Sequence, residues 1–221
     1  MKSLKPNSES SNAQIRLPQR QRGILRFEHL LDATEALLIE FPDEDISLAL
    51  VASKAEVPLP SIYHFFPNKD AILVALAQRY HVALAEMACE EMNPRPLTWQ
   101  EIIRWRQQNG VLFLNRHPSA LRLFMGAGVS AQVRTLDLQG NASLSALRAA
   151  EFRRWFDCSA IADLEEHLAI SIGMMDGIWA LSWSRHKRVT DAFLEESIRA
   201  SVAYLRCFLP EILPLVKQIK T

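Results

Sequence analysis

Histidine and cysteine are the residues of this chain best suited to catalysis or metal binding, and their spacing favours neither. No nucleophile, base and orienting group recur together, so a small helical enzyme remains only an alternative. The cysteines form no CxxC pair, which predicts free, mostly buried thiols in a reducing cytosol and no cofactor or metal. These residues are His29, His64, His81, His117, His167, His186, Cys89, Cys158 and Cys207.

Basic residues gather at the front of a chain whose formal net charge is zero. Residues 1–26 hold six basic residues against Glu9 alone, whereas residues 40–45 form an acidic run. This local excess indicates binding to nucleic acid, and an ordinary solvated basic arm is the alternative. The basic residues are Lys2, Lys5, Arg16, Arg20, Arg22 and Arg26.

Composition and periodicity predict an all-α protein. Apolar residues make up 49% of the 221, enough for a folded core. Helical spacing recurs along the chain and long strand-like alternation is missing. The polar residues 1–18 predict a flexible arm without a signal peptide. Since no apolar stretch reaches about 18 residues without charge, we expect a cytoplasmic protein without a membrane span.

Short helices with defined ends follow the arm. A first apolar face runs from Leu30 to Phe41, where Pro42 stops the helix. Ser47 stands at an N-cap position before a helix that ends near residue 55. A second short helix is predicted over residues 60–66, and Asn68 can cap a helix from residue 69 to about 92. Two short helices joined by a tight turn form the helix-turn-helix pattern.

Residues 46–76, ISLALVASKAEVPLPSIYHFFPNKDAILVAL, resemble the DNA-binding half of the TetR family of bacterial transcriptional regulators. The run before them, LLDATEALLIEF, is similar to that family's first helix. The resemblance covers about residues 22–82. Its matching positions are Ser47, Val51, Ala52, Ala55, Val57 and the run from Ile62 to Lys69.

The resemblance implies which side chains meet DNA. Tyr63 and Lys69 would contact phosphate, although a packing role for Tyr63 and a solvated Lys69 are alternatives. Ser47 and Arg22 could also meet the backbone, and His64 either a base edge or a phosphate. Base preference could depend on Ser61, on Leu59 against thymine methyl groups, and on DNA shape.

Two features depart from the family pattern. Glu56 stands where the family's turn usually carries glycine, so the turn must form without an easy positive φ. Residues 58–60, Pro-Leu-Pro, replace the usual small or basic residues, which leaves fewer groups to read bases.

The second half predicts further helices over residues 98–115, 118–125 and 143–156. Residues 126–141 contain glycines and no clean period, so they predict a loop or a broken helix. Two final helices carry apolar stripes over residues 164–183 and 194–209.

Aromatic and sulfur-containing residues of this half could line a cavity for an apolar or aromatic effector. The alternative is a plain hydrophobic core with a dimer seam. The candidate cavity residues are Trp105, Gln108, Phe124, Met125, Trp155, Met175 and Trp179. The family resemblance implies that the last two helices form a homodimer interface, with Leu168, Ile172, Trp183, Ile198, Val202 and Leu205 as candidates.

We therefore expect three parts: an arm over residues 1–18, a helix-turn-helix domain over 19–70, and a ligand-binding and dimerisation domain over 71–221. The function expected is a repressor that an effector releases from a palindromic operator. The alternative is a ligand-independent DNA binder whose second domain only dimerises or binds a protein.

Overall fold

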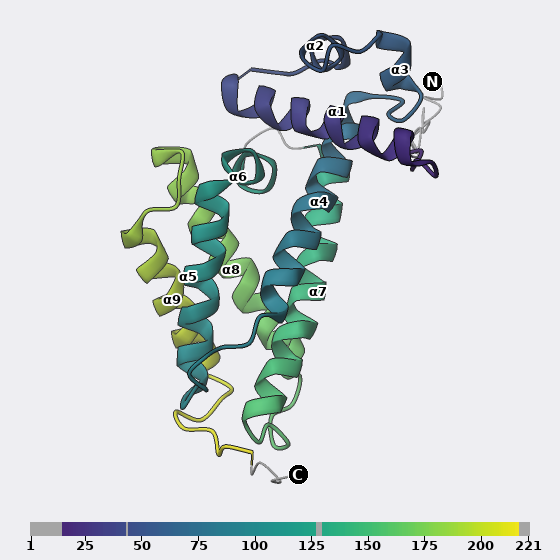
Figure 1. Ribbon diagram of the computed structural model, residues 1–221. Helices are drawn as coiled ribbons and strands as arrows, with labels where there is room; N and C mark the ends of the chain where they lie inside the picture. The colour runs from purple at the N-terminus through teal and green to yellow at the C-terminus, as the bar shows by residue number, and fades with distance from the viewer. Residues whose placement is uncertain (1–14, 43, 127–129, 217–221) are drawn as a thin grey trace, which may run out of the picture. The chain divides into compact units, whose positions relative to one another are not determined.

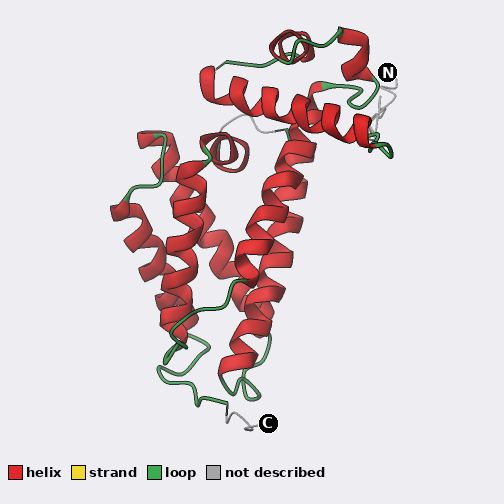
Figure 2. Ribbon diagram, in the orientation of Figure 1, coloured by secondary structure: helices red, strands yellow, loops and turns green. Residues whose placement is uncertain are grey.

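The computed structural model describes residues 15–42, 44–126 and 130–216, and in these ranges it contains helices and no strand (Figure 2). The predicted all-α class is confirmed. The chain divides into two compact units, one ending at Ala75 and the other beginning at Leu76. Of the predicted arm, residues 1–14 lie outside the described ranges.

The first unit is organised around α1 (Gln21–Glu40). The predicted face of α1 is confirmed, since Leu30, Leu31 and Leu37 are buried, and the buried face extends back to Phe27. The ring centroid of Phe27 lies 4.8 Å from that of Phe66 and 5.8 Å from that of Phe65. These aromatic contacts fix the segment that follows α3 against α1.

The helix-turn-helix consists of α2 (Leu48–Lys54) and α3 (Leu59–Tyr63). The predicted Ser47 cap is confirmed, because its Oγ accepts a hydrogen bond from Leu50 N at 3.2 Å. The second helix is shorter than the predicted residues 60–66. A hydrogen bond from Phe66 N to Ile62 O, 2.9 Å long, adds one further turn after it.

The turn between α2 and α3 contains a positive φ, in contrast to the sequence expectation. Glu56 has a φ of 53°, in the left-handed region. Hydrogen bonds from Glu56 N to Ser53 O (3.1 Å) and from Val57 N to Ala52 O (3.0 Å) hold it there. A side chain in this region costs about 1–2 kcal/mol, because Cβ crowds the following carbonyl.

Helix α4 (Lys69–Cys89) begins in the first unit and continues past the unit boundary. Its predicted cap is confirmed by a 2.9 Å hydrogen bond from Ala71 N to Asn68 Oδ1. Among the described helices, α4 alone has the length and mean hydropathy, 1.2, of a possible membrane span. Arg79 and Glu86 lie inside it, and charges there are costly in a bilayer.

In its described residues, the second unit contains the rest of α4 and five further helices, which can be followed in Figure 1. Helix α8 packs against both α7 and α9, and α5 packs against α9. Fully buried Trp99, Phe152 and Leu205 belong to its core, and Trp99 Nε1 donates to Pro210 O at 2.9 Å. The five helices are α5 (Trp99–Arg116), α6 (Pro118–Met125), α7 (Ala131–Trp155), α8 (Leu164–His186) and α9 (Asp191–Leu205).

Residues 126–141 were predicted to form a loop or a broken helix, and from Ala131 onward they instead belong to an unbroken helix. Residues 131–155 form one helix, which Ser130 caps by accepting a hydrogen bond from Val133 N. The pattern hides this helix because glycine and polar residues occupy its inner face. Gly140 faces the His81 ring and Asn141 bonds Asp176, so tertiary contacts outweigh weak helix propensity.

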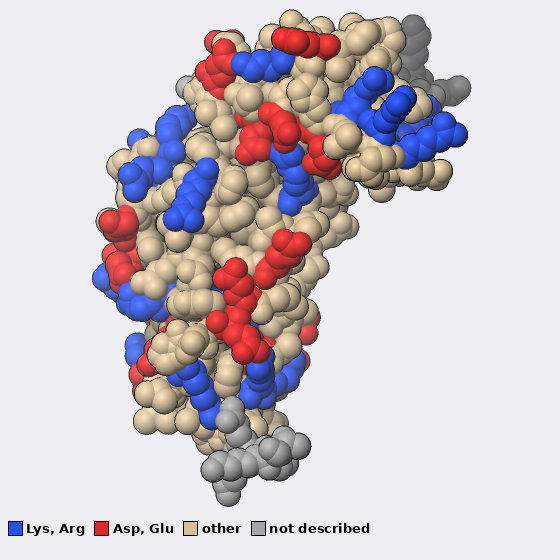
Figure 3. Space-filling view, viewed as in Figure 1, with Lys and Arg blue, Asp and Glu red and all other residues tan. Residues whose placement is uncertain are grey.

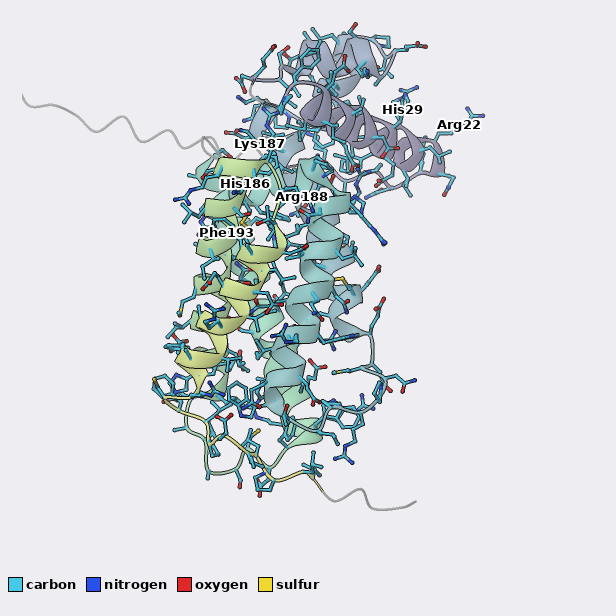
Figure 4. The ribbon with its side chains drawn as sticks, turned by 90° about the vertical axis from the view of Figure 1, so that its left-hand side faces the viewer. Arg22, His29, His186, Lys187, Arg188 and Phe193 are labelled. Atoms are coloured by element: carbon cyan, nitrogen blue, oxygen red, sulfur yellow. The ribbon has the colours of Figure 1, made fainter. Side chains whose placement is uncertain are left out.

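Buried amide and hydroxyl groups tie the helices of this unit together. Gln107 Nε2 donates to Ser201 Oγ at 2.8 Å, and Trp179 Nε1 donates to Ser197 Oγ at 2.9 Å. Lys187, which follows α8 (Figure 4), has a φ of 55°. Two residues later, Val189 N donates to the Asn115 side chain, which in turn donates to Val189 O. These bonds join α5, α8 and α9.

Replacing Glu56 by glycine should stabilise the chain. Glu56→Gly removes the Cβ crowding at a φ of 53°, and the greater freedom of glycine in the unfolded chain offsets part of the gain. We expect the free energy of unfolding to rise by about 0.5–1 kcal/mol, measured by urea denaturation. Glu56→Gln is the control, because it removes the charge and keeps Cβ. An equal gain in both variants would show that charge, not backbone strain, limits this turn.

Candidate nucleic-acid interface and ligand cavity

In the first unit, the described end of the arm lies beside the residues that follow α3, and together with the start of α1 they form a groove. The Arg16 N–H donates to Phe65 O at 3.1 Å, which holds the arm against the residues after α3. A Cβ on Gly23 would lie 3.0 Å from Pro18 Cβ, so the glycine lets the arm cross the first turn of α1 closely. The basic residue types that line the groove are Arg16, Arg20, Arg22, Arg26 and His64.

The four arginines of this groove are exposed. Figure 3 shows Lys and Arg side chains gathered around the start of α1, and in Figure 4 the Arg22 side chain extends away from that helix. Within the described ranges, none of the four has a carboxylate partner. Unpaired guanidinium groups in a row suit the phosphates of a nucleic-acid backbone.

Helix α3 has one buried side and one open side. Ile62 is fully buried, whereas Leu59, Tyr63 and His64 are exposed and Ser61 is partly so. The sequence-predicted contact residues of α3 therefore lie at the surface. Tyr63 is half exposed, at 51%, which leaves its hydroxyl able to reach a ligand.

The starts of α2 and α4 carry the remaining predicted contacts. Ser47 is exposed at the start of α2 while its side chain caps that helix. Lys69 Nζ pairs with both carboxylate oxygens of Asp45, at 2.6 and 2.8 Å. His29 supports this region, because its Nε2 lies 3.0 Å from Ala55 O and links α1 to the end of α2 (Figure 4).

The second unit encloses a cavity of about 100 Å³ between α4, α5, α6, α7 and α8. Four of the predicted residues line it: Phe124, Met125, Met175 and Trp179.

Three predicted cavity residues lie elsewhere. Gln108 is exposed on the outer face of α5, and its neighbour Gln107 lines the cavity instead. Trp105 lies beneath the Arg106 guanidinium, 4.4 Å from the ring centroid. Trp155 belongs to the hydrophobic core. Each of the three has the residue type expected of a cavity wall, but its position around its helix directs the side chain away from the cavity.

Buried acidic groups at one end of the cavity were missed by the sequence reasoning. Asn141 Nδ2 donates to Asp176 Oδ2 at 2.6 Å, and Arg134 donates to Asp137 at 2.6 Å. Asp176 has some access through the cavity, but protein atoms surround its carboxyl, and this burial raises its pKa to about 7. Burial also raises the pKa of Asp137.

His81 completes this acidic end. Its Nε2 is buried without a hydrogen-bond partner and lies 3.7 Å from Asp137 Oδ1. Burial lowers the pKa of His81, so the ring is neutral at pH 7 and the contact is not an ion pair. A Cβ on Gly140 would lie 2.2 Å from the imidazole ring, so only glycine lets His81 take this position.

Two arginines occupy the other end of the cavity. Glu151 accepts from Arg106 at 2.6 and 3.0 Å and from Arg148 at 2.7 Å. Arg106 also donates to Met87 O and Glu90 O. Burial lowers the pKa of Arg148 to about 10, so it stays charged at pH 7.

The predicted dimer residues are mostly core residues. Leu168, Trp183, Ile198 and Leu205 are buried within the protomer, while Ile172 and Val202 are partly buried, with Ile172 in the cavity wall. The apolar stripe was recognised, but it faces the protomer's own core. The outer face of α8 carries a different stripe, made of Ile170, Gly173, Met174, Gly177 and Leu181.

Residues 30–76 match the family described as bacterial regulatory proteins, tetR family. This match covers most of α1, the helix-turn-helix and the start of α4. The helix-turn-helix region of the chain is therefore similar to that of the TetR family.

Relatives of this chain include the HTH-type transcriptional regulator EthR of Mycobacterium tuberculosis, 32% identical over 106 residues. The alignment covers 48% of this chain and 49% of EthR, so the chain spans about half the length of the curated relatives it matches.

Solved structures share the fold over most of the chain. A TetR-family regulator from Streptomyces coelicolor has a TM-score of 0.64 and 23% identity, covering 83% of this chain and 99% of that chain. SmeT, the repressor of the Stenotrophomonas maltophilia multidrug efflux pump SmeDEF, has a TM-score of 0.59 and 15% identity, covering 88% and 93%.

The buried carboxyl of Asp176 should make stability depend on pH. Its pKa is raised from 3.8 to about 7 on folding, so the folded chain binds more protons between these values. Stability from this group is therefore lost as pH rises from about 4 to 7. Asp176→Asn should stabilise the chain more at pH 8 than at pH 5, by at most about 2–3 kcal/mol. Urea denaturation followed by tryptophan fluorescence measures this difference, and an equal effect at both pH values would contradict it.

Proposed function

We propose that this chain is a cytoplasmic transcriptional repressor that binds a palindromic operator as a homodimer and is released by a small apolar or aromatic effector. The groove of four arginines beside α3 carries the proposal. Helix α3 would enter the major groove, where Leu59, Ser61 and His64 could meet base edges, while the arginines hold the flanking backbone.

Phosphate contact at α4 requires Lys69 to exchange its partner. The Lys69–Asp45 pair is on the surface, with 82% of the Asp45 side chain exposed. Such pairs contribute at most about 1 kcal/mol, so a DNA phosphate could displace Asp45. Tyr63 and Ser47 would donate hydrogen bonds to phosphates on either side of α3.

The relatives support a regulatory function. EthR is named as a transcriptional regulator, and SmeT is described as the repressor of an efflux pump. Both descriptions agree with a DNA-binding role for the arginine groove.

Homodimerisation would use the exposed stripe of α8. Gly173 and Gly177 are exposed, and a Cβ added to either would meet no protomer atom within 4 Å. Each glycine weakens the helix by about 1 kcal/mol relative to alanine, yet protomer packing needs neither. Close approach of the same helix from a second copy explains both glycines, with Met174 and Leu181 supplying the apolar contacts.

Effector control would work by a population shift. An effector that binds better to the conformation with separated recognition helices would lower operator affinity. Helix α4 would carry the change, because it begins at Lys69 and lines the cavity at His81. A cavity that combines apolar walls with buried charged groups favours this regulated form over the ligand-independent alternative.

Operator binding should depend steeply on salt and on the arginines of the groove. We expect Arg20→Gln and Arg26→Gln each to lower the slope of log K against log[salt] by about 1, because each removes one phosphate contact. Fluorescence anisotropy with duplex DNA from the promoter region beside the chain's own gene measures the slope. Lys54→Gln is the control, since Lys54 pairs with Glu40 at 2.8 Å outside the groove. A salt-independent affinity would refute the DNA-binding proposal.

A charge in the α8 stripe should separate the dimer. Leu181→Arg would bring two arginines together across a two-fold axis, and we expect a dissociation constant raised at least about 100-fold. Sedimentation equilibrium measures the change. The exposed Leu138 of α7 provides a control, Leu138→Arg, at a similar exposure outside the stripe. A dimer unaffected by Leu181→Arg would place the interface elsewhere.

A further inference from the structure

The two charged ends of the cavity differ in how completely their charges are paired. At the basic end, Glu151 bridges Arg106 and Arg148, and two backbone carbonyls take further Arg106 donors. At the acidic end, the only charged partner of Asp137 among the described residues is Arg134, whose side chain is 52% exposed. In the same ranges Asp176 bonds only the neutral amide of Asn141. The described part of the acidic end therefore lacks a buried cation.

The acceptors at this end line one cavity from three helices: His81 from α4, Asp137 from α7 and Asp176 from α8. Asn141 stands one helical turn after Asp137 on α7, and it binds Asp176 from α8. Asp176 Oδ1 has no hydrogen-bond partner among the described residues, and neither has His81 Nε2. The carboxylates of Asp137 and Asp176 and the neutral imidazole of His81 offer three acceptors. An ammonium ion, which has three N–H donors, could bond to all three.

The position of the His81 ring depends on a glycine in the neighbouring helix α7. Gly140 lies inside a 25-residue helix, where glycine costs about 1 kcal/mol relative to alanine. An added Cβ would overlap the His81 ring, so the glycine maintains this arrangement.

Aromatic and apolar side chains adjoin the acidic end. Trp179 stands three residues after Asp176 on α8, and the His81 ring centroid lies 4.7 Å from that of Phe124. Along α7, Asp137 and Arg148 are 11 residues apart, or about 16 Å at 1.5 Å per residue. The apolar wall between the charged ends therefore suits a body shorter than this length.

We propose that the cavity binds an apolar molecule with a cationic amine head, the ammonium lying between Asp137, Asp176 and His81 and the body against Trp179, Phe124 and Met175. This ligand class rests on the effector-controlled function proposed above, and it specifies that effector. The cation supplies the charge that Arg134 provides only from the surface.

Three probes of equal chain length test the head group: hexylamine, hexanol and hexanoate. Their binding to the full chain without DNA is measured by the change in tryptophan fluorescence and the shift in Tm. We expect hexylamine to bind at least about ten-fold more tightly than the other two, because a hydrogen bond to a charged group adds this much. The proposal would be overturned if hexanoate bound as tightly as hexylamine, or if none of the three probes bound.

Two substitutions with opposite effects exclude a general structural cause. Asp176→Asn should remove most of the preference for hexylamine and leave hexanol binding unchanged. Arg134→Gln should increase hexylamine affinity several-fold, because it removes the competing cation of Asp137. Asp191→Asn, at an exposed position outside the cavity, is the control. A hexylamine preference that survives Asp176→Asn would overturn the assignment.

Adding the probes to the protein–DNA complex separates this inference from the function on which it rests. Hexylamine binding with DNA release supports both. Hexylamine binding without release supports the amine site and contradicts effector control. Equal release by all three probes supports effector control and overturns the amine class.

Discussion

A helix of five residues is too short to be stable alone in water, so α3 depends on packing against α2 and, through the residues that follow it, against α1. Ile62 and Phe66 are fully buried and Phe65 nearly so, with Phe27 of α1 in contact with both phenylalanines. This packing fixes the rotation of α3, and hence the exposure of Tyr63 and His64. The same segment receives the Arg16 N–H at Phe65 O, so one apolar contact area also positions the arginine groove.

The second unit is governed by a different constraint, the cost of burying charge. Asp137, Asp176 and Arg148 lie in a region of low polarity, where each charge needs partners. Glu151 largely meets this need at one end of the cavity, whereas the other end leaves Asp176 with a neutral amide. A fold selected for stability alone would place apolar residues there. The incomplete pairing is therefore the feature on which the proposed amine site rests.

The sequence predicted local features well and orientation poorly. Ser47, Asn68 and the ends of α6 were predictable because caps and prolines act over a few residues. The exposed stripe of α8, proposed as the dimer interface, was not predictable, because the stronger apolar period on α8 and α9 faces the protomer core. The exposed stripe of α8 contains Gly173 and Gly177, which periodicity does not detect. Likewise, sequence could not show that Asp176 points inward, since most aspartates are solvated.

The cavity's stability cost and its proposed ligand preference have the same origin. Above pH 7 the Asp176 carboxyl is ionised near one surface guanidinium, and burial of this charge destabilises the folded chain; burial opposes the charged form of Asp137 as well. A bound ammonium would neutralise this charge, so its binding energy would come partly from relieving a strain already present. Such a ligand shifts the conformational equilibrium only if the Asp137–Asp176 spacing differs between the two states. Because Asp137 lies on α7 and Asp176 on α8, a change in the packing of these two helices would alter that spacing and link the amine to the state of the whole unit.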